Sequence, residues 1–581
     1  MILQALLAYY EALAARGEIS PPGWGPAKIS FALCISEDGR LEQVASLRSK
    51  SKRGKFIPRI IQLPAGINSR ASGIASNFLW DNAGYLLGVD NKGKPERSLK
   101  CFACCRLLHQ ELLTNAKSPA ARALLAFFNS WQPEEAPNHP ALQENWAEIT
   151  GAANLVFRFN GQFIHDDPEI RQIWQQYYNN EETGEKDEDT PKLTCLITGK
   201  YGSVEKTHPQ IKGVLGAQSS GAALVSFNAE AFCSYGREQN LNAPVSKYAA
   251  FAYTTALNRL LADSRHVSRF GDATVVCWAQ GGEHAYQNAF MAMAFGEEPA
   301  DSADYTEDDL LGMLKSLCRG EPVMFEDALL SPDTTFYVLG LSPNAARLSV
   351  RFFLRNSFGS FLSSVMAHRQ RLEICGLEQG LSLWRLLRET VNQNANDQSP
   401  LPNLTGEVLR SILTNTPYPA TLLNQTRLRI RAERKLTPGR AAIIKAYYLR
   451  NTHKDVPKEV LTVKLNPDST NIPYTLGRLF AVLEAVQSAA NPGLNTTIKD
   501  KYFDSAAATP SHVFPTLLKL AQKHLRKMTE GQRIYYDKQI CGLMGILAEE
   551  FPNNLTLPQQ GGFQLGYYHQ YQQRFQKKEE Q

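Results

Sequence analysis

The sequence lacks the marks of a membrane or secreted protein. No run of about 18 apolar residues suggests a membrane span. The N-terminal MILQALLAYYEALAARGEI has no basic start and carries Glu11 within a helical pattern, which argues against a signal peptide. The ten cysteines are scattered and mostly flanked by apolar residues, so a reduced, cytoplasmic chain is the simplest expectation.

Common catalytic motifs are missing as well. The sequence has no Gly-x-Ser-x-Gly, Gly-x-Gly-x-x-Gly or His-Glu-x-x-His. Cys101-x-x-Cys104-Cys105 with His109 has half of a zinc spacing, but no second pair is nearby and the segment is amphipathic. Structural helix cysteines are therefore expected, and no metal or other cofactor.

One histidine–aspartate pair resembles a metal-binding dyad. His165 precedes Asp166 and Asp167 at a boundary between a strand and a helix. Either aspartate, as the N-cap of a helix whose first position is Pro168, accounts for the pattern more simply. The sequence gives weak support for an enzyme.

The glycine-rich stretch GVLGAQSSGAALVSFN (213–228) looks like a phosphate-cradling loop. It lacks the lysine of a nucleotide-binding P-loop and the Ser or Thr that follows that lysine. Its glycines permit close approach, and its amide and hydroxyl groups suit a groove or phosphates. The other interpretation is a tight turn with internal hydrogen bonds.

Charge is modest in total but clustered along the chain. Charged residues make up 20% of the chain, and the net charge is only +5. Segment 47–59 carries six basic residues and no acidic one, segment 427–450 carries eight against Glu433, and 519–528 is a third basic cluster on a predicted helix. Each is typical of a solvated face, but three together favour a nucleic-acid partner.

The pattern predicts an α+β N-terminal region with short β-sheets, followed by a C-terminal helical bundle. At 581 residues the chain is too long for one core, so about two to four domains are expected. Predicted strands are 28–35, 155–159, 193–197, 222–227, 273–279, 335–341 and 347–354. Predicted helices are 101–114, 117–131, 247–262, 377–389, 438–450, 474–489, 511–527 and 532–549.

Three stretches of the sequence are distinctive. They are RASGIASNFLWDNAGYLLG (70–88), GVLGAQSSGAALVSFNAEAFCSYGREQNLNAPVS (213–246) with AFAYTTALNRLL (250–261), and FYVLGLSPNAARLSVRFF (336–353). Together they resemble the large subunit of the type I-C CRISPR Cascade (surveillance) complex. The resemblance covers essentially the full length, and the middle stretch is its most specific part.

The resemblance implies a non-enzymatic subunit of an RNA-guided complex. In such a complex, base pairing with the guide RNA reads the target strand, and the protein reads a short motif in the DNA duplex. Such a subunit recognises the protospacer-adjacent motif in double-stranded DNA, assists duplex opening and R-loop stabilisation, and recruits the helicase–nuclease. Its implied partners are guide RNA, target DNA, the backbone and guide-processing subunits, the helicase–nuclease, and a small subunit made from the same gene.

The sequence pattern and the resemblance together predict three domains. They are an α+β region for motif and guide-complex contacts (1–355), a helical connecting region with the basic segment (356–459), and a small-subunit-like bundle (460–581). No methionine lies between Met366 and Met528, so an internal product beginning near residue 460 needs a non-AUG start. The candidates are Val460, Leu461 and Val463.

Two groups of residues are predicted to touch nucleic acid. Minor-groove readers use backbone and short polar side chains because the groove is narrow. The residues expected at the motif or groove are Asn68, Ser69, Arg70, Ser72, Gly73, Asn77, Gly216, Gln218, Ser219 and Ser220. Those expected at the phosphate backbone are Lys50, Lys52, Arg53, Lys55, Arg427, Arg429, Arg431, Arg434, Lys435, Arg440, Lys445, Lys519, Lys523, Arg526 and Lys527.

Two alternatives from other classes stay open at this point. One is a metal-dependent nucleic-acid-processing enzyme that uses His165, Asp166 and distant carboxylates. Incubation with labelled nucleic acid and Mg²⁺ or Mn²⁺ distinguishes it. The other is a stand-alone RNA-binding scaffold, which binds without a guide-bearing complex.

Overall fold

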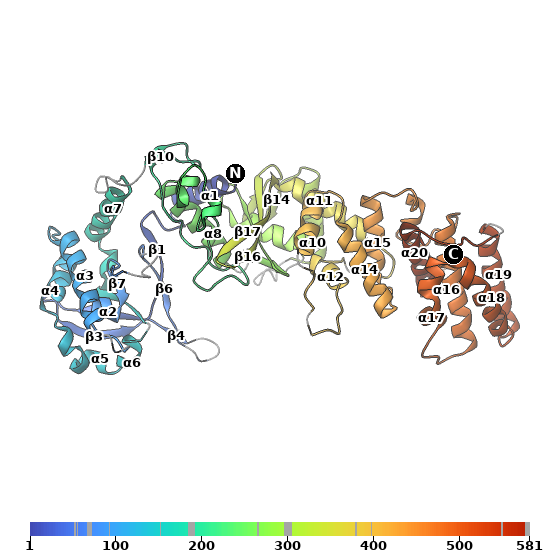
Figure 1. Cartoon of the computed structure of the whole chain (residues 1–581), viewed down its shortest axis with the longest axis horizontal. Coiled ribbons are helices and arrows are strands. Elements are labelled where there is room, and N and C mark those ends of the chain that lie inside the picture. The colour runs from blue at the N-terminus through green and yellow to red at the C-terminus, as the bar shows by residue number, and fades with distance from the viewer. Residues whose placement is uncertain are drawn as a thin grey trace. The chain divides into compact units, whose positions relative to one another are not determined.

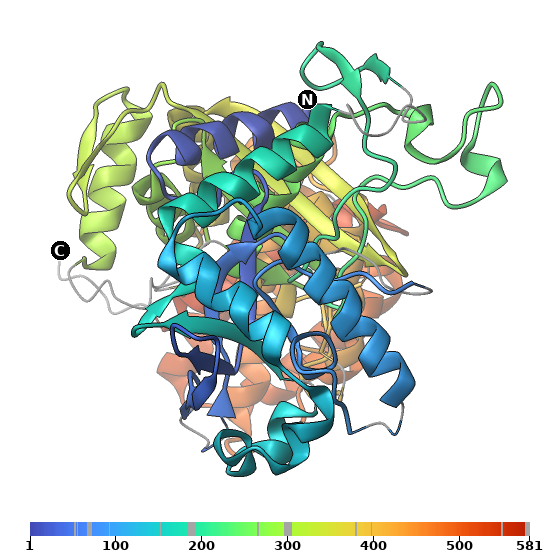
Figure 2. The same cartoon turned by 90° about the vertical axis from the view of Figure 1, so that its left-hand side faces the viewer.

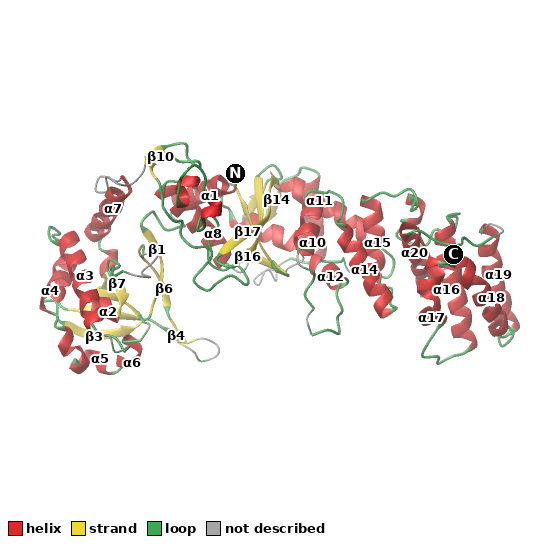
Figure 3. Cartoon of the chain, in the orientation of Figure 1, coloured by secondary structure: helices red, strands yellow, loops and turns green. Residues whose placement is uncertain are grey.

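The computed structural model describes the chain except for residues 51–53, 55, 67–72, 92, 94, 152, 184–191, 264–266, 296–304, 378–379, 397, 402, 548–549 and 576–581. The described chain divides into two compact units. The first contains Met1–Lys212 and Ser219–Arg259, and the second contains Gly213–Gln218 and Leu260–Gln581. The strands labelled in Figure 1 all precede residue 358, and helices with connecting loops follow them (Figure 3). This confirms the predicted α+β class.

A five-stranded sheet forms the centre of the first unit. Phe31 and Leu33 of one strand join Phe157 of its parallel neighbour on one face, in a core shared with helices α3 (Pro95–Leu113) and α4 (Pro119–Ser130). These two helices lie side by side (Figure 2). The strand order is β3 (Leu41–Ser46), β2 (Phe31–Ile35), β8 (Asn154–Phe159), β7 (Trp80–Asn82), with β9 (Gln162–Phe163) paired to β8.

The opposite face of this sheet packs against a two-stranded ribbon. The ribbon is made of β1 (Trp24–Ile29) and β6 (Arg59–Pro64), and its Ile29 and Leu63 meet the sheet at Val156. The predicted strand 28–35 is thus split between ribbon and sheet. The break falls at Ser30, which bonds through its backbone to residues 47 and 154.

The other elements of the first unit are mostly short. Two sequence predictions are wrong here: segment 193–197 is extended only to Thr194, and 222–227 contributes an isolated bridge at Ala222 rather than a strand. The elements are α1 (Ile2–Ala15), β4 (Ser49–Lys50), β5 (Phe56–Ile57), α2 (Ala83–Leu86), η1 (Pro133–Asn138), α5 (Pro140–Gln143), α6 (Trp146–Ile149), η2 (Ile164–Asp166), α7 (Pro168–Thr183), β10 (Lys192–Thr194), β11 (Tyr201–Ser203), η3 (Glu230–Phe232), η4 (Gln239–Asn242) and α8 (Lys247–Ala262).

A four-stranded antiparallel sheet begins the second unit. Its strands are β12 (Val267–Phe270), β13 (Ala273–Ala279), β16 (Thr335–Asn344) and β17 (Arg347–Ser357), in that order, which confirms three predicted strands. One face packs on aromatic residues: the ring of Phe336 lies 4.9 Å from that of Phe290 and 5.3 Å from that of Phe358. The covering elements are α9 (His284–Phe290), the π-helix η6 (Met291–Phe295), α10 (Glu307–Cys318) and α11 (Phe358–Leu372), with a small hairpin of β14 (Val323–Phe325) and β15 (Ala328–Leu330).

The rest of the second unit is helical. Predicted helices are confirmed at α15, α16, α18 and α19, whereas 377–389 is helical only at α12. Helices α13, α14, α17 and α20 were not predicted. The bounds are α12 (Leu383–Arg388), α13 (Leu404–Leu413), α14 (Ala420–Glu433), α15 (Pro438–Arg450), η7 (Lys458–Val460), α16 (Ile472–Ala490), α17 (Ile498–Ala508), α18 (Pro510–Leu525), α19 (Glu530–Ile546) and α20 (Leu557–Gln573).

Two glycines allow α16 and α20 to approach closely. A Cβ at Gly477 would overlap the carbonyl oxygen of Phe563, and one at Gly566 would overlap that of Tyr474. Since both obstacles are backbone atoms, no rotamer change relieves the clash. Each helix therefore carries a glycine where its partner's main chain passes.

Replacing Gly477 by alanine should destabilise the bundle, because the two helices must separate to make room. We expect a loss of about 1–3 kcal/mol in the free energy of unfolding, measured by thermal or denaturant unfolding. Gly542→Ala in α19 is the matched control, because no atom lies within 4 Å of the added Cβ. This control should gain up to about 1 kcal/mol from helix propensity. Equal behaviour of the two variants would contradict the close crossing.

Candidate nucleic-acid interface

The basic segment 47–59 forms a hairpin in which cations lie on aromatic rings. Strands β4 and β5 pair Lys50 with Phe56. The guanidinium of Arg48 lies 4.7 Å from the Phe56 ring centre and 4.3 Å from that of Phe31, and it is paired with Glu148. The ammonium of Lys50 lies 5.6 Å from Phe56. The predicted Lys52, Arg53 and Lys55 lie outside the described residues.

Two further arginines of the first unit lie near the aromatic ring of Phe163. Arg158 on β8 pairs with Phe163 on β9, and its guanidinium lies 4.1 Å from the ring centre. The guanidinium of Arg59, on β6, lies 6.0 Å from the same ring. The Nε of Arg158 is buried and has no hydrogen-bond partner among the described residues. The sequence did not single out Arg158, because one arginine in an apolar strand carries no charge-run signal.

The predicted groove loop at 67–77 is described only at its end. Asn68, Ser69, Arg70 and Ser72 lie outside the described residues, and Gly73 is exposed. Asn77 is only 6% exposed, and its N–H donates to the Asp81 carboxylate at 3.0 Å. The expectation that Asn77 reaches a base edge is therefore corrected: burial removes it from the surface.

Asp81 and Asn82 have structural roles. Asp81 is buried and accepts hydrogen bonds from two backbone N–H groups. Asn82 is the N-cap of α2 and accepts from the N–H of Gly84. Together they hold the turn between β7 and α2.

The second predicted groove loop displays its polar residues. Gly216 and Gln218 belong to the second unit, Ser219 and Ser220 belong to the first, and all four are exposed. Gly216 has φ +77°, and a Cβ there would lie 3.2 Å from Pro343. The N–H of Leu215 donates to Thr274 Oγ1, so the loop before Gln218 is fixed to the four-stranded sheet.

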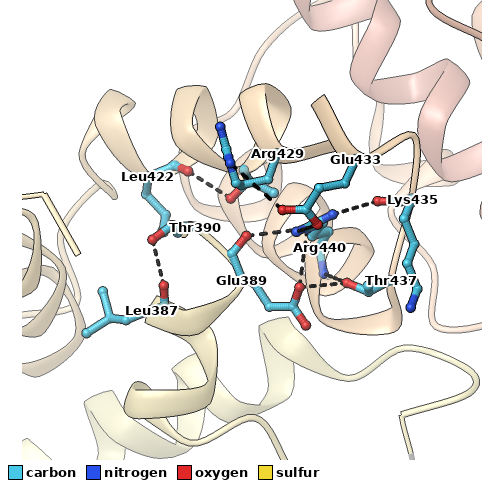
Figure 4. A network of polar contacts seen from close by, with 10 residues as sticks. Leu387, Glu389, Thr390, Leu422, Arg429, Glu433, Lys435, Thr437 and Arg440 are labelled. Atoms are coloured by element: carbon cyan, nitrogen blue, oxygen red, sulfur yellow. Dashed lines mark hydrogen bonds and ion pairs between the residues drawn. The ribbon is translucent and has the colours of Figure 1, made fainter. Parts of the chain in front are cut away.

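The basic segment 427–450 contains a buried cation cluster. Arg440 is 1% exposed; its Nη2 lies 2.6 Å from Glu433 Oε2, and its Nε lies 3.3 Å from Glu389 Oε2 (Figure 4). Its Nη1 donates to the carbonyl of Lys435, and Thr437 donates to Glu389. The predicted phosphate role of Arg440 is corrected, because its guanidinium is fully engaged inside the protein.

Two other cations of this segment face the interior. Lys445 is buried and donates to the carbonyls of Arg371 and Glu373, and burial lowers its pKa to about 8. Arg427 is half-buried and donates to the carbonyl of Leu557 at the start of α20. Lys445 is therefore also removed from the predicted phosphate-contacting set, and Arg427 is mainly a tether between helices.

The remaining predicted cations of the second unit lie at the surface. Arg429 is half-buried near Glu433, at 3.9 Å. Helix α18 contains no acidic residue, and its exposed cations recur at a spacing that places them on one face. The exposed set is Arg431, Arg434 and Lys435 at the end of α14, and Lys519, Lys523, Arg526 and Lys527 along and just after α18.

The two motifs with catalytic appearance are structural. His109 is buried, bonds Cys105 O through Nδ1 and accepts from the Leu79 N–H through Nε2, and burial lowers its pKa to about 4. Asp167 accepts from the N–H groups of residues 169 and 170, which confirms a helix N-cap before Pro168. Among the described residues, no group of three or more His, Cys, Asp or Glu is placed to hold a metal.

A family model described as CRISPR-associated protein (Cas_Csd1) matches residues 6–575, nearly the whole chain. The chain belongs to this family. Membership in the Cas_Csd1 family supports the assignment to the large subunit of a Cascade complex. No match was found among the curated proteins. Among the helices described in this family member, none combines the length and apolar character of a membrane span.

Segment 427–450 should separate into a stabilising part and a surface part. Arg440→Ala takes the buried cation away from Glu389 and Glu433, whose side chains are 15% and 28% exposed, so we expect a loss of about 3 kcal/mol in unfolding free energy. Replacing Arg431, Arg434 and Lys435 together by alanine should leave stability within about 0.5 kcal/mol and weaken binding to nucleic acid. Thermal unfolding and a binding titration check both. Weaker binding of a normally stable Arg440→Ala protein would contradict this division.

Proposed function

We propose that this chain is the large subunit of a type I-C Cascade complex. It recognises the protospacer-adjacent motif in double-stranded DNA, helps to open the duplex and stabilise the R-loop, and recruits the helicase–nuclease. It acts in the cytoplasm without enzymatic activity of its own, with guide RNA and the backbone and guide-processing subunits as partners. Family membership supports a CRISPR-associated role. Motif recognition and duplex opening are inferred from the cations and exposed loop residues of the candidate nucleic-acid interface.

The observation that carries this proposal is a group of cations beside aromatic rings in the first unit. Lys50 and Arg59 are exposed and lie 5.6 and 6.0 Å from ring centres, whereas Arg158 is half-buried and Arg48, whose side chain is 12% exposed, is paired with Glu148. Lysine and arginine side chains neutralise phosphates, and aromatic rings beside them hold these side chains in place. Lys52, Arg53 and Lys55, which lie between β4 and β5 in the sequence, add further positive charge and would grip the duplex backbone.

Motif reading is assigned to the exposed loop residues. Gln218 carries both a donor and an acceptor, as a contact to a base edge requires, and Gly216 lets the backbone come close. Ser219 and Ser220 add short hydroxyl groups, and Asn68, Ser69, Arg70, Ser72 and Gly73 form the other assigned set. The exposed cations of α14 and α18 would face the heteroduplex or the displaced strand.

Replacing Lys50, Lys52, Arg53 and Lys55 by alanine should weaken binding of the guide-loaded complex equally for all motif sequences. Each lost phosphate contact should lower the slope of log K against log salt by about 0.9. Filter binding over a salt series measures both effects. Arg319→Ala, which removes an exposed cation paired with Glu321, is the control and should change neither.

Gln218→Ala should instead reduce discrimination between correct and incorrect motifs while leaving the salt slope unchanged. Loss of binding to one motif sequence alone in the quadruple variant would contradict its backbone role.

The same gene should also produce a small subunit from an internal start. Helices α16–α20 lie wholly within 460–581, so a product of roughly 120 residues contains all five. Mass spectrometry of the purified complex should find this species. Synonymous codons at Val460, Leu461 and Val463 that cannot initiate should remove it and leave the full-length chain unchanged. Detection of the full-length chain alone in the unaltered complex would contradict the internal start.

A further inference from the structure

A small pocket in the second unit combines an exposed tryptophan with two arginines. The hollow holds about 80 Å³, well below the volume of enclosed ligand sites, so a ligand bound here would lie partly outside it. Its walls come from the turn between β12 and β13, from α12, and from the loop that follows α12. They include Arg269, Gly271, Trp384, Leu387, Arg388 and Gln398.

The lining has the chemistry of a site for a base and its phosphate. Trp384 is 53% exposed, so part of its ring surface is open to a ligand. The Arg388 guanidinium lies 4.6 Å from the Trp384 ring centre, and its Nε is buried without a hydrogen-bond partner among the described residues. Arg269 adds a second cation, and none of the lining residues is acidic.

Helix α12, which carries Trp384 and Arg388, is held against neighbouring helices by the residue that follows it. The residue after α12 is Glu389, whose carboxylate is bound by the buried Arg440 and by Thr437. Thr390 donates to the carbonyl of Leu387, which itself lines the pocket (Figure 4). A short helix of six residues is thereby fixed against the bundle, so the pocket is a built feature.

We propose that this pocket binds one nucleotide of a single-stranded nucleic acid. The base stacks on Trp384, and its phosphate meets Arg388 and Arg269. Stacking on aromatic residues beside cations is the common way to hold unpaired strands, since every base has a π-face. A protein-binding patch also uses Trp and Arg, but two arginines without an acidic residue among the described lining residues favour a phosphate-bearing ligand.

This inference deepens the proposed function and rests on it, because duplex opening releases an unpaired strand. It differs from the motif contacts in residues and in ligand. The two therefore fail separately: a protein that binds single strands through Trp384 but ignores the motif would contradict only the motif proposal.

The test uses the full-length chain and labelled oligonucleotides of about ten residues, one of thymidine and one of uridine. Fluorescence anisotropy gives the affinity, and free thymidine and uridine monophosphates serve as competitors. Trp384→Ala should weaken oligonucleotide binding about tenfold, which corresponds to about 1.4 kcal/mol, whereas Trp384→Phe should retain most of the affinity. Arg388→Gln should weaken binding and flatten its salt dependence.

Tyr535→Ala is the matched control, because Tyr535 is an exposed aromatic residue of the same unit outside the pocket. Its affinity should equal that of the unaltered chain. Unchanged affinity of both Trp384→Ala and Arg388→Gln would overturn the proposal and leave the patch to a protein partner. Equal affinity for the free monophosphate and the oligonucleotide would also overturn it, because the pocket would then serve a small nucleotide.

Discussion

The packing of α12, α14 and α15 in the second unit depends on one buried cation, Arg440. Taking Arg440 out of water carries a large desolvation cost, which only well-placed partners offset. Those partners come from three segments: Glu389 after α12, Glu433 at the end of α14, and the carbonyl of Lys435 before α15. Because all must be satisfied together, the cluster fixes these helices relative to one another (Figure 4). The pocket wall on one side and the exposed cations on the other are positioned by the same contact.

A run of positive charge in this chain therefore has two different functions. Within 427–450, the side chains of Arg440 and Lys445 are buried, whereas those of Arg431, Arg434 and Lys435 are exposed. Glu433 is bound to the buried Arg440, and the acidic neighbour of Arg431 and Arg434 is Asp504 on α17. A chain of net charge +5 thus presents local surfaces that are more basic than its total suggests.

The sequence predicted those elements whose pattern needs no distant partner. Strand β13 is a continuous apolar run, and α15 has a Thr cap with Pro at its first turn, so both were located correctly. The strand expected at 222–227 failed because its apolar residues follow a glycine turn and take part in isolated bridges at Ala222 and Ala223, not in a strand. Counting charges could not separate Arg440 from Arg434, since burial depends on Glu389, far away in sequence. Arg158 and Trp384 were not predicted for the same reason. The neighbours that indicate their roles, Phe163 and Arg269, come from other elements of the fold.

The packing around residue 460 sets a condition on any separate small subunit. Helix α20 lies against α15, where a Cβ at Gly561 would meet the Tyr448 ring at 2.6 Å, and Tyr568 donates to the carbonyl of Cys375. A product that begins near 460 keeps α16–α20 but loses both of these partners, so it exposes the surface at Gly561 and Tyr568 that the full-length chain covers. Exposed apolar surface of this kind favours association. The separate bundle should therefore be stable only when another protein surface replaces α15, which makes incorporation into the complex a requirement for its accumulation.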